Sequence, residues 1–269
     1  MHLSSTRFAS ARKFVRIANE TSSLRIGERG RVVQIVQQGL IDIGFSLGSS
    51  DSIFGRNTEF CVKQFQKRYQ LLEDGIIGSK TLAKLDNLLS GYQHQIRVHF
   101  RSINLTNVGF GQIIESTKNV YAQYGIKVEM ASGRSLYLTS EQTKKYFSIK
   151  TGCEWTISSG EVFELQGLGG SVPSNEILVY FVNKFDDVTL LGCGGHARNR
   201  PAATVASNAS QWDTAHEIGH VLLTSAFSPV HSTASSNLMY AYSNSSSSIP
   251  TLNNRQLTQI RQSVCCLSI

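Results

Sequence analysis

The chain has 269 residues, and 41% of them are hydrophobic, so it can bury a well-packed core and is not a disordered protein. Its longest strongly apolar run, Ile177–Val182, is far shorter than the roughly 20 residues that a membrane-spanning helix needs, so no transmembrane segment is expected. The net charge of +7 is spread thinly, without the clustered basic and aromatic residues of a nucleic-acid surface. We therefore expect a solvated surface that is compatible with acidic polymers, and no nucleic-acid partner.

The N-terminal segment, residues 1–21, is basic: it has one acidic residue, Glu20, and four basic residues, Arg7, Arg12, Lys13 and Arg16. It lacks an apolar stretch of about 7–15 residues and so differs from an ordinary secretory signal. We expect a flexible basic tail here, with an export or docking role as the alternative.

An internal near-repeat lies within residues 22–92. The segments DSIFGRNT, from Asp51, and DGIIGSKT, from Asp74, both read Asp-x-Ile-apolar-Gly-x-x-Thr. In each, Asp and Gly suit a tight loop, the apolar pair can fill a core, and the Thr can cap the following helix. Apolar residues at helical spacing follow each segment and also precede both of them, in RVVQIVQQGLIDIGF. The pattern predicts a compact unit of three helices.

Three runs in order, VVQIVQQGLIDIGF, DSIFGRNTEFCVKQFQ and LLEDGIIGSKTLAKL, resemble the peptidoglycan-binding domain of many cell-wall hydrolases and of matrix metalloproteinase pro-segments. The resemblance covers residues 28–90 and implies peptidoglycan as a partner, with the ligand groove near the two repeated loops. A helical module that only packs on its neighbour is the alternative. Cys61 stands where a small apolar residue is usual, so we expect a buried core thiol there.

A second domain is expected at residues 96–269, after a linker at Ser90–Gln95. Alternating apolar residues in IRVHFRSINL predict a strand, and a helix from about Gln112 to Tyr124 should follow. IKVEMA predicts a second strand, and NEILVYFVNKF predicts a strand buried on both faces. These elements predict an α+β fold with a mixed sheet packed on helices.

The pattern His-Glu-x-x-His occurs once, at His216, Glu217 and His220. Helix residues four apart share a face, so both imidazoles can point at one metal ion while Glu217 reaches a water beside it. A zinc site needs a third protein ligand. From Val221 onward there is no Asp or Glu, and His231 is the single histidine, so elimination leaves His231 as the third ligand.

From His231 the chain runs HSTASSNLMY, with Met239 eight residues on. Together with the upstream pattern, this run resembles the metzincin metallopeptidases, and their matrixin-like branch most closely. The resemblance implies His216, His220 and His231 as Zn²⁺ ligands, Glu217 as general base, and Met239 in a tight turn beneath the imidazoles. It also implies that the upstream run GCGGHARNRPAATVAS holds an edge strand to which an extended peptide could add.

Three other side chains enter this hypothesis in weaker roles. Tyr240 and Tyr242 follow the expected turn, and either could help hold an oxyanion or be purely structural. His196 is a competing ligand candidate, but it is expected at the surface or beside the substrate because three ligands already complete a set.

The sequence departs from the metzincin pattern after His220. The family has a Gly three residues after the second His, and here that position is Leu223; His231 then lies eleven residues after His220. Without the Gly we expect the helix to continue for about another turn, with Pro229 following its end.

The cysteines are odd in number and include no C-x-x-C pair, so a thiolate zinc site is not expected and at least one thiol is free or pairs between chains. They are Cys61, Cys153, Cys193, Cys265 and Cys266. We expect a Cys153–Cys193 disulfide, with Cys265 or Cys266 as alternative partners, and a zinc-blocking role for Cys193 as a minor alternative. Acidic residues are not clustered outside Asp186–Asp187, so no rich set of calcium sites is expected.

The two resemblances together imply a zinc-dependent metalloendopeptidase that cuts protein or peptide substrates and is held at the bacterial cell wall. The alternatives are a peptidoglycan hydrolase that cuts stem peptides and a non-enzymatic wall-binding protein with a structural zinc. Glu217 argues against the last, since a structural site needs no base. The expected location is extracellular, periplasmic or at the wall. Delivery as a phage or contractile-injection effector, without an ordinary signal, is compatible with this class and is left open.

Overall fold

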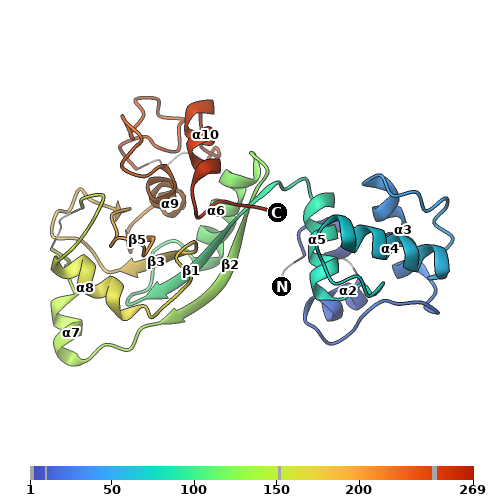
Figure 1. Cartoon of the computed structure of the whole chain (residues 1–269). Helices are drawn as coiled ribbons and strands as arrows, with labels where there is room; N and C mark the ends of the chain where they lie inside the picture. The colour runs from blue at the N-terminus through green and yellow to red at the C-terminus, as the bar shows by residue number, and fades with distance from the viewer. Residues whose placement is uncertain (1–2, 10, 151–152, 244–246) are drawn as a thin grey trace. The chain divides into compact units, whose positions relative to one another are not determined.

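The computed structural model describes residues 3–9, 11–150, 153–243 and 247–269, and the chain divides into two compact units (Figure 1). The first comprises the residues up to Gln93 together with Ile269, and the second comprises His94–Ser268. In the described part of the chain, no helix has both the length and the apolar character needed to cross a membrane.

The first unit is helical. Its elements are α1 (Thr6–Ala9), α2 (Arg12–Ala18), α3 (Arg31–Asp42), α4 (Arg56–Arg68) and α5 (Ser79–Leu89). The last three fall where the sequence predicts helices, because each carries apolar residues that recur on one face and are fully buried in a common core. Cys61 belongs to that core, with 6% of its surface exposed, as expected.

The expectation of a flexible basic tail is wrong. Thr6–Ala9 and Arg12–Ala18 form α1 and α2, and their apolar residues Phe8, Phe14 and Ile17 are fully buried in the core of the first unit. The rings of Phe8 and Phe14 meet edge to face with centroids 4.9 Å apart. The basic residues of this segment suggested an exposed tail, but its apolar residues form a face that is buried. Burying that face stabilises the helices far more than their own helix propensity does.

The repeated loops are held by a glutamine that precedes each of them. Gln37 is 1% exposed, and its Nε2 donates to Asp51 Oδ1 at 2.8 Å, to the Ile53 carbonyl at 3.0 Å and to Thr58 Oγ1 at 2.9 Å. Gln66 holds the second loop in the same way, through Asp74, Ile76 and Thr81. The threonines therefore do not cap α4 and α5 as expected.

The N-cap positions of these two helices are Gly55 and Gly78, which offer no side chain. Each buried glutamine amide instead forms hydrogen bonds with the polar groups of its loop, because a buried polar group needs a hydrogen-bond partner. The near-repeat in the sequence is thus a repeated hydrogen-bond network in the structure.

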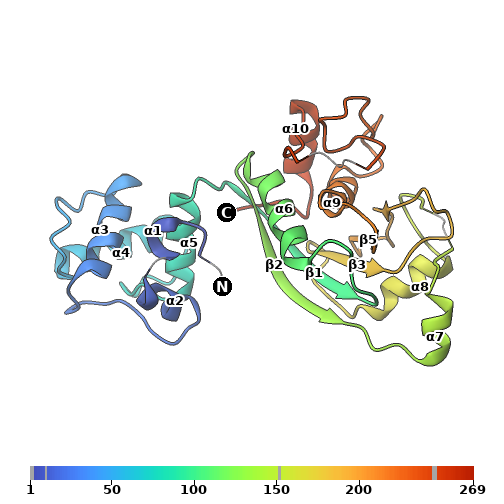
Figure 2. The same cartoon turned by 180° about the vertical axis from the view of Figure 1, so that it is seen from behind.

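The second unit is built on an open mixed sheet of six strands in the order β2-β1-β3-β5-β4, with β6 pairing β1 (Figure 2). The strands are β1 (His94–Ser102), β2 (Ile126–Ser135), β3 (Ile177–Val182), β4 (Gly192–Cys193), β5 (Ala202–Ala206) and β6 (Leu267–Ser268). β1, β2, β3 and β5 run parallel, whereas β4 and β6 are antiparallel to their neighbours. The mixed sheet is the one that the sequence predicts.

Helices cover both faces of this sheet (Figures 1 and 2). On one face α6 (Phe110–Ala122), α9 (Asp213–Leu223) and α10 (Asn254–Gln262) share a core with alternate residues of β1 and β3. On the other face α8 (Gly160–Leu168) packs on Leu178, Tyr180 and Val182 of β3, while α7 (Ser140–Lys145) has no buried residue. Because β3 is buried on both faces, its sequence is continuously apolar.

The helix α9 ends sooner than the sequence suggests. It stops at Leu223, and Thr224 has a φ of 62°. The expected extra turn past Leu223 is therefore absent. A positive φ at a residue other than glycine is uncommon, and here it turns the chain out of the helix without the glycine that usually does so.

Candidate metal centre

The helix α9 is anchored beneath the site by its apolar side. Ala215, Ile218 and Leu222 are fully buried in the core that α9 shares with α6 and the sheet. Its opposite side carries His216 and His220, which lie one turn apart and face the same way. The amphipathic pattern of α9 thus fixes the direction of both imidazoles.

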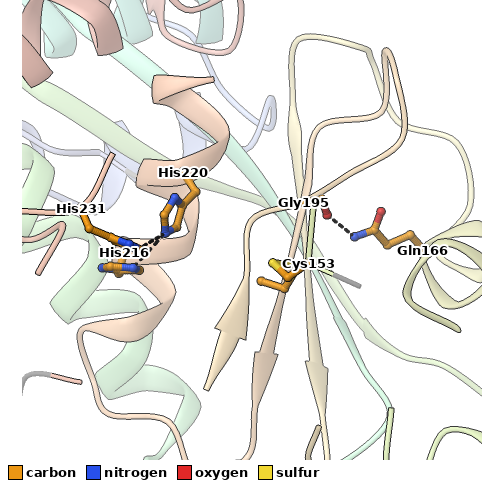
Figure 3. Close-up of a disulfide and its surroundings, with 7 residues drawn as sticks. Cys153, Gln166, Gly195, His216, His220 and His231 are labelled. Atoms are coloured by element: carbon orange, nitrogen blue, oxygen red, sulfur yellow. Dashed lines mark hydrogen bonds between the residues drawn. A yellow bond between two sulfur atoms is a disulfide. The ribbon is translucent and has the colours of Figure 1, made fainter. Parts of the chain in front are cut away.

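Three imidazoles converge at this place (Figure 3). His220 Nε2 lies 3.0 Å from His216 Nε2 and 3.2 Å from His231 Nε2. In the described part of the chain, these three residues form the one group of metal-ligating side chains whose donor atoms all lie within 4.8 Å. The structure therefore brings together the three histidines that the sequence predicts as ligands.

The chemistry of this donor set fits a zinc ion. His216 Nδ1 lies 2.7 Å from the Leu238 carbonyl, so it donates its proton there and leaves Nε2 as a free lone pair. Burial and the two neighbouring imidazoles lower the pKa of His220 to about 2, and burial also lowers the pKa of His216 and of His231. Three neutral imidazoles with converging lone pairs can hold Zn²⁺ and leave a fourth position for water.

Met239 is fully buried and packs against Gly219 of α9, between His216 and His220 in the chain. Its backbone is held in a tight turn, because Met239 N donates to Asn237 Oδ1 at 2.9 Å and its carbonyl accepts from Ser232 N at 2.7 Å. A β-carbon on Gly219 would lie 2.6 Å from Met239 Sδ, which is closer than side chains pack. The glycine inside the His-Glu-x-x-His pattern thus makes room for the methionine.

Glu217 lies beside the imidazoles and is 6% exposed. Burial, and secondarily the negative charge of Asp213, raise the pKa of Glu217 well above its ordinary value. A β-carbon on Gly192 would overlap the Glu217 carboxylate, so the edge strand β4 can pass directly over it because it lacks a side chain there. A carboxyl group with a raised pKa is suited to taking up and returning a proton.

A cleft of about 360 Å³ opens over this cluster and is lined by residues from α9, β4, the Met239 turn and the segment around Trp155. The Trp155 ring lies edge to face with His220, with centroids 5.7 Å apart. Cys153 and Cys193 form a disulfide with a Cα–Cα distance of 5.6 Å, the pairing expected from the sequence (Figure 3). Because Cys193 is in this bond, it is not a free thiol that could block the zinc.

The remaining predicted residues divide between the cleft and its surroundings. Tyr240 and Tyr242 both line the cleft, with ring centroids 5.5 Å apart, and Tyr242 is 74% exposed. His196 does not belong to the cluster; its backbone forms a parallel bridge with Thr156. The backbone at His196, in the run where the sequence predicts an edge strand for an extended substrate, is thus already paired with the chain's own Thr156. Cys265 and Cys266 are buried and unpaired.

Two residues that sequence reasoning missed, Glu154 and Trp155, form one wall of the cleft. The segment CEWT has no motif or periodicity, so no local signal marks it as part of the site. A partial signal was available in the glycines of GCGG, because a run of glycines often marks a close approach of two backbones.

Comparison with known proteins assigns part of the chain. Residues 29–85 match the family "Putative peptidoglycan binding domain", so the first unit contains a peptidoglycan-binding domain of this kind. The chain is also 30% identical over 155 residues to the type VI secretion system spike protein VgrG3 of Vibrio cholerae serotype O1. That match covers 48% of this chain but only 15% of the Vibrio protein.

Solved structures also match parts of the chain. A peptidoglycan-binding protein from Clostridioides difficile, solved in complex with glutamine hydroxamate, is 40% identical over 26% of this chain and 44% of its own, with a TM-score of 0.25. Metalloproteinase-II from Bacteroides fragilis is 14% identical over 63% of this chain and 53% of its own, with a TM-score of 0.43. The chain thus combines a helical peptidoglycan-binding domain with a separate mixed-sheet unit that carries the histidine cluster.

Proposed function

We propose that this protein is a zinc-dependent metallopeptidase that hydrolyses peptide bonds at the bacterial cell wall. The observation that carries the proposal is the convergence of three imidazole Nε2 atoms next to a buried glutamate, at the bottom of an open cleft. In this assignment His216, His220 and His231 hold the ion, and Glu217 is the general base. A bound zinc would acidify a water molecule and polarise the scissile carbonyl.

The residues around the ion have separate tasks. Glu217 accepts a proton from the attacking water at a carboxylate oxygen and later donates it to the amine of the leaving peptide. Its raised pKa favours the first transfer, because a carboxylate with a raised pKa is a stronger base toward the attacking water. The Leu238 carbonyl keeps His216 in one tautomer, and the buried Met239 supports the plane of the imidazoles. Tyr240 lines the cleft where it could donate to an oxyanion.

The peptidoglycan-binding domain at residues 29–85 supports a location at the cell wall or in the periplasm. Partial similarity to a type VI secretion spike protein favours delivery by a secretion machine. The same domain favours a second candidate function, in which the zinc site cuts the stem peptides of peptidoglycan itself. The buried Glu217 in the cleft weighs against a zinc of purely structural role, because nothing structural requires an acid–base group there.

The test compares the full chain with Glu217→Gln, which keeps the shape of the side chain but loses its basicity. Each protein is loaded with zinc and given a denatured protein or purified sacculi, and new amino termini are counted. We expect at least a hundredfold loss of turnover with unchanged zinc content, since positioned acid–base groups contribute about 10²–10⁴-fold. His231→Ala should lose the zinc as well. Equal turnover in Glu217→Gln, or full zinc content in His231→Ala, would refute the assignment.

The two substrates separate the two candidate functions. New amino termini from the protein alone indicate a peptidase that is targeted to the wall. New amino termini released from sacculi indicate a wall-degrading enzyme.

A further inference from the structure

The walls of the cleft have a one-sided charge. Besides the three imidazoles, Glu217 and two tyrosines, the ionisable side chains among the described residues that line it are Glu154 and Asp213. None of these described lining residues is a Lys or Arg, although the chain has 26 of them. Asp213 is 8% exposed, and its Oδ2 already accepts from Ser210 N at 2.7 Å and from Ser243 Oγ at 2.9 Å. Among the lining residues, Glu154 is therefore the charged side chain left to meet a substrate.

The backbone of Glu154 is fixed on both sides. The preceding residue, Cys153, is joined by the disulfide to Cys193 of the edge strand β4. The Glu154 carbonyl packs so closely on Gly195 that a β-carbon there would overlap it, so only glycine allows this approach. The carboxylate is thus presented from an anchored segment.

The next residues complete the anchoring. The Trp155 carbonyl accepts from His196 N at 3.4 Å, and Ile157 N donates to the His196 carbonyl at 3.0 Å. The Trp155 ring is half-buried and lies against His220, so it forms a wall directly beside the site of reaction. Glu154 and Trp155, neighbours in the chain, therefore both line the cleft from this anchored segment.

The Glu154 carboxylate has no oppositely charged partner among the described residues. It is exposed, and none of the described residues forms a salt bridge or a hydrogen bond with its side chain. An ammonium or guanidinium group is attracted both by a free carboxylate and by the face of a Trp ring.

We infer that Glu154, with Trp155 beside it, selects substrates that carry a cationic side chain close to the bond that is cut. This inference rests on the proposed peptidase function and names its substrate class. The cation can come from Lys or Arg of a protein or from the free side-chain amine of a wall stem peptide. Because an exposed ion pair and an exposed cation–π contact are each modest, we expect a preference of about tenfold, equivalent to about 1.4 kcal/mol.

The experiment uses peptides that differ at one residue, which is Lys, norleucine or Glu, placed in turn at each position flanking the cleaved bond. The full chain should show kcat/KM about tenfold higher for Lys than for norleucine at one position. In Glu154→Gln this ratio should fall to about one, and in Glu154→Lys the Glu peptide should become the preferred one. Glu141→Gln is the matched control, since Glu141 is exposed and does not line the cleft, and its ratio should match that of the parent chain. A stem peptide with a free or an acetylated side-chain amine forms the second arm and identifies the source of the cation.

A binding measurement separates this inference from the proposed function. Zinc-loaded Glu217→Ala is titrated with the Lys and norleucine peptides, and tryptophan fluorescence is followed, because the chain has two Trp residues and Trp212 is only 5% exposed. If Glu217→Ala binds the Lys peptide more tightly than the norleucine peptide, and the double variant with Glu154→Gln binds both equally, the inference is supported even without turnover. Equal affinities, or a Lys preference that survives Glu154→Gln, overturn it even if peptides are cleaved.

Discussion

Replacing Gly219 by Ala tests whether the methionine turn packs directly against the helix that carries two of the imidazoles. Inside a helix, Ala is more favourable than Gly by about 1 kcal/mol. Here the new β-carbon would lie 2.6 Å from Sδ of the fully buried Met239. Forcing an extra carbon into a packed core costs about 1–3 kcal/mol, which should cancel the helix gain or exceed it. Displacing Met239 also shifts the adjacent Leu238 carbonyl, so zinc affinity should fall through the hydrogen bond to His216.

The assay is thermal unfolding of the second unit, compared with Gly167→Ala in α8, where a β-carbon would meet nothing within 4 Å. Gly219→Ala should be about 1–3 kcal/mol less stable than this control, or about 2–12 °C lower in Tm. Competition with a chelator measures the zinc affinity. Adding Met239→Ala removes the obstructing sulfur, so the double variant should show coupling between the two sites. If Gly219→Ala and Gly167→Ala are equally stabilising and zinc affinity is unchanged, the packing described for Met239 is wrong.

Two further predictions concern groups buried away from the cleft. Gln37→Ala should lower the free energy of unfolding of the first unit by about 1–3 kcal/mol in chemical unfolding, because it leaves the buried Thr58 hydroxyl without its amide partner. Glu73→Ala is the control: Glu73 makes none of these bonds, so its replacement should have little effect. Iodoacetamide at pH 8 should leave Cys265 and Cys266 unlabelled in mass spectra until the chain unfolds. Burial raises the pKa of Cys265 to about 12 and that of Cys266 to about 11. Below these pH values only a small fraction of each thiol is the reactive thiolate, and that fraction increases as the pH rises. Rapid labelling of the native chain would contradict this burial.

The helices of the first unit show what local sequence patterns predict and what they miss. α3, α4 and α5 follow from apolar residues at helical spacing, because a helix presents every third or fourth residue to the same neighbour. The same reasoning missed α1 and α2, where four basic residues interrupt Phe8, Phe14 and Ile17. The composition of that segment indicates solvent, whereas the core that α5 and its neighbours form gives the three apolar side chains a place to be buried.

The end of α9 is a second case in which local rules gave the wrong answer. Leu223 stands where the metzincin pattern has a Gly, so the sequence predicts another turn. Leu223 is nevertheless fully buried in the core of the second unit, and the chain leaves the helix at Thr224 with a positive φ. A residue other than glycine in such a backbone conformation costs about 1–3 kcal/mol, a cost that the surrounding structure must offset.

The sequence by itself determined the chemistry of the candidate site: a helix with two imidazoles four residues apart, one further histidine downstream, and a glutamate between them. These follow from helical periodicity and from the few residue types that can bind a metal. Only the tertiary structure decided what surrounds that chemistry. Glu154 and Trp155 reach the cleft because a disulfide and a backbone bridge join two segments about 40 residues apart in the chain. Contacts of that kind depend on how the whole sheet folds and leave no periodic trace in the local sequence.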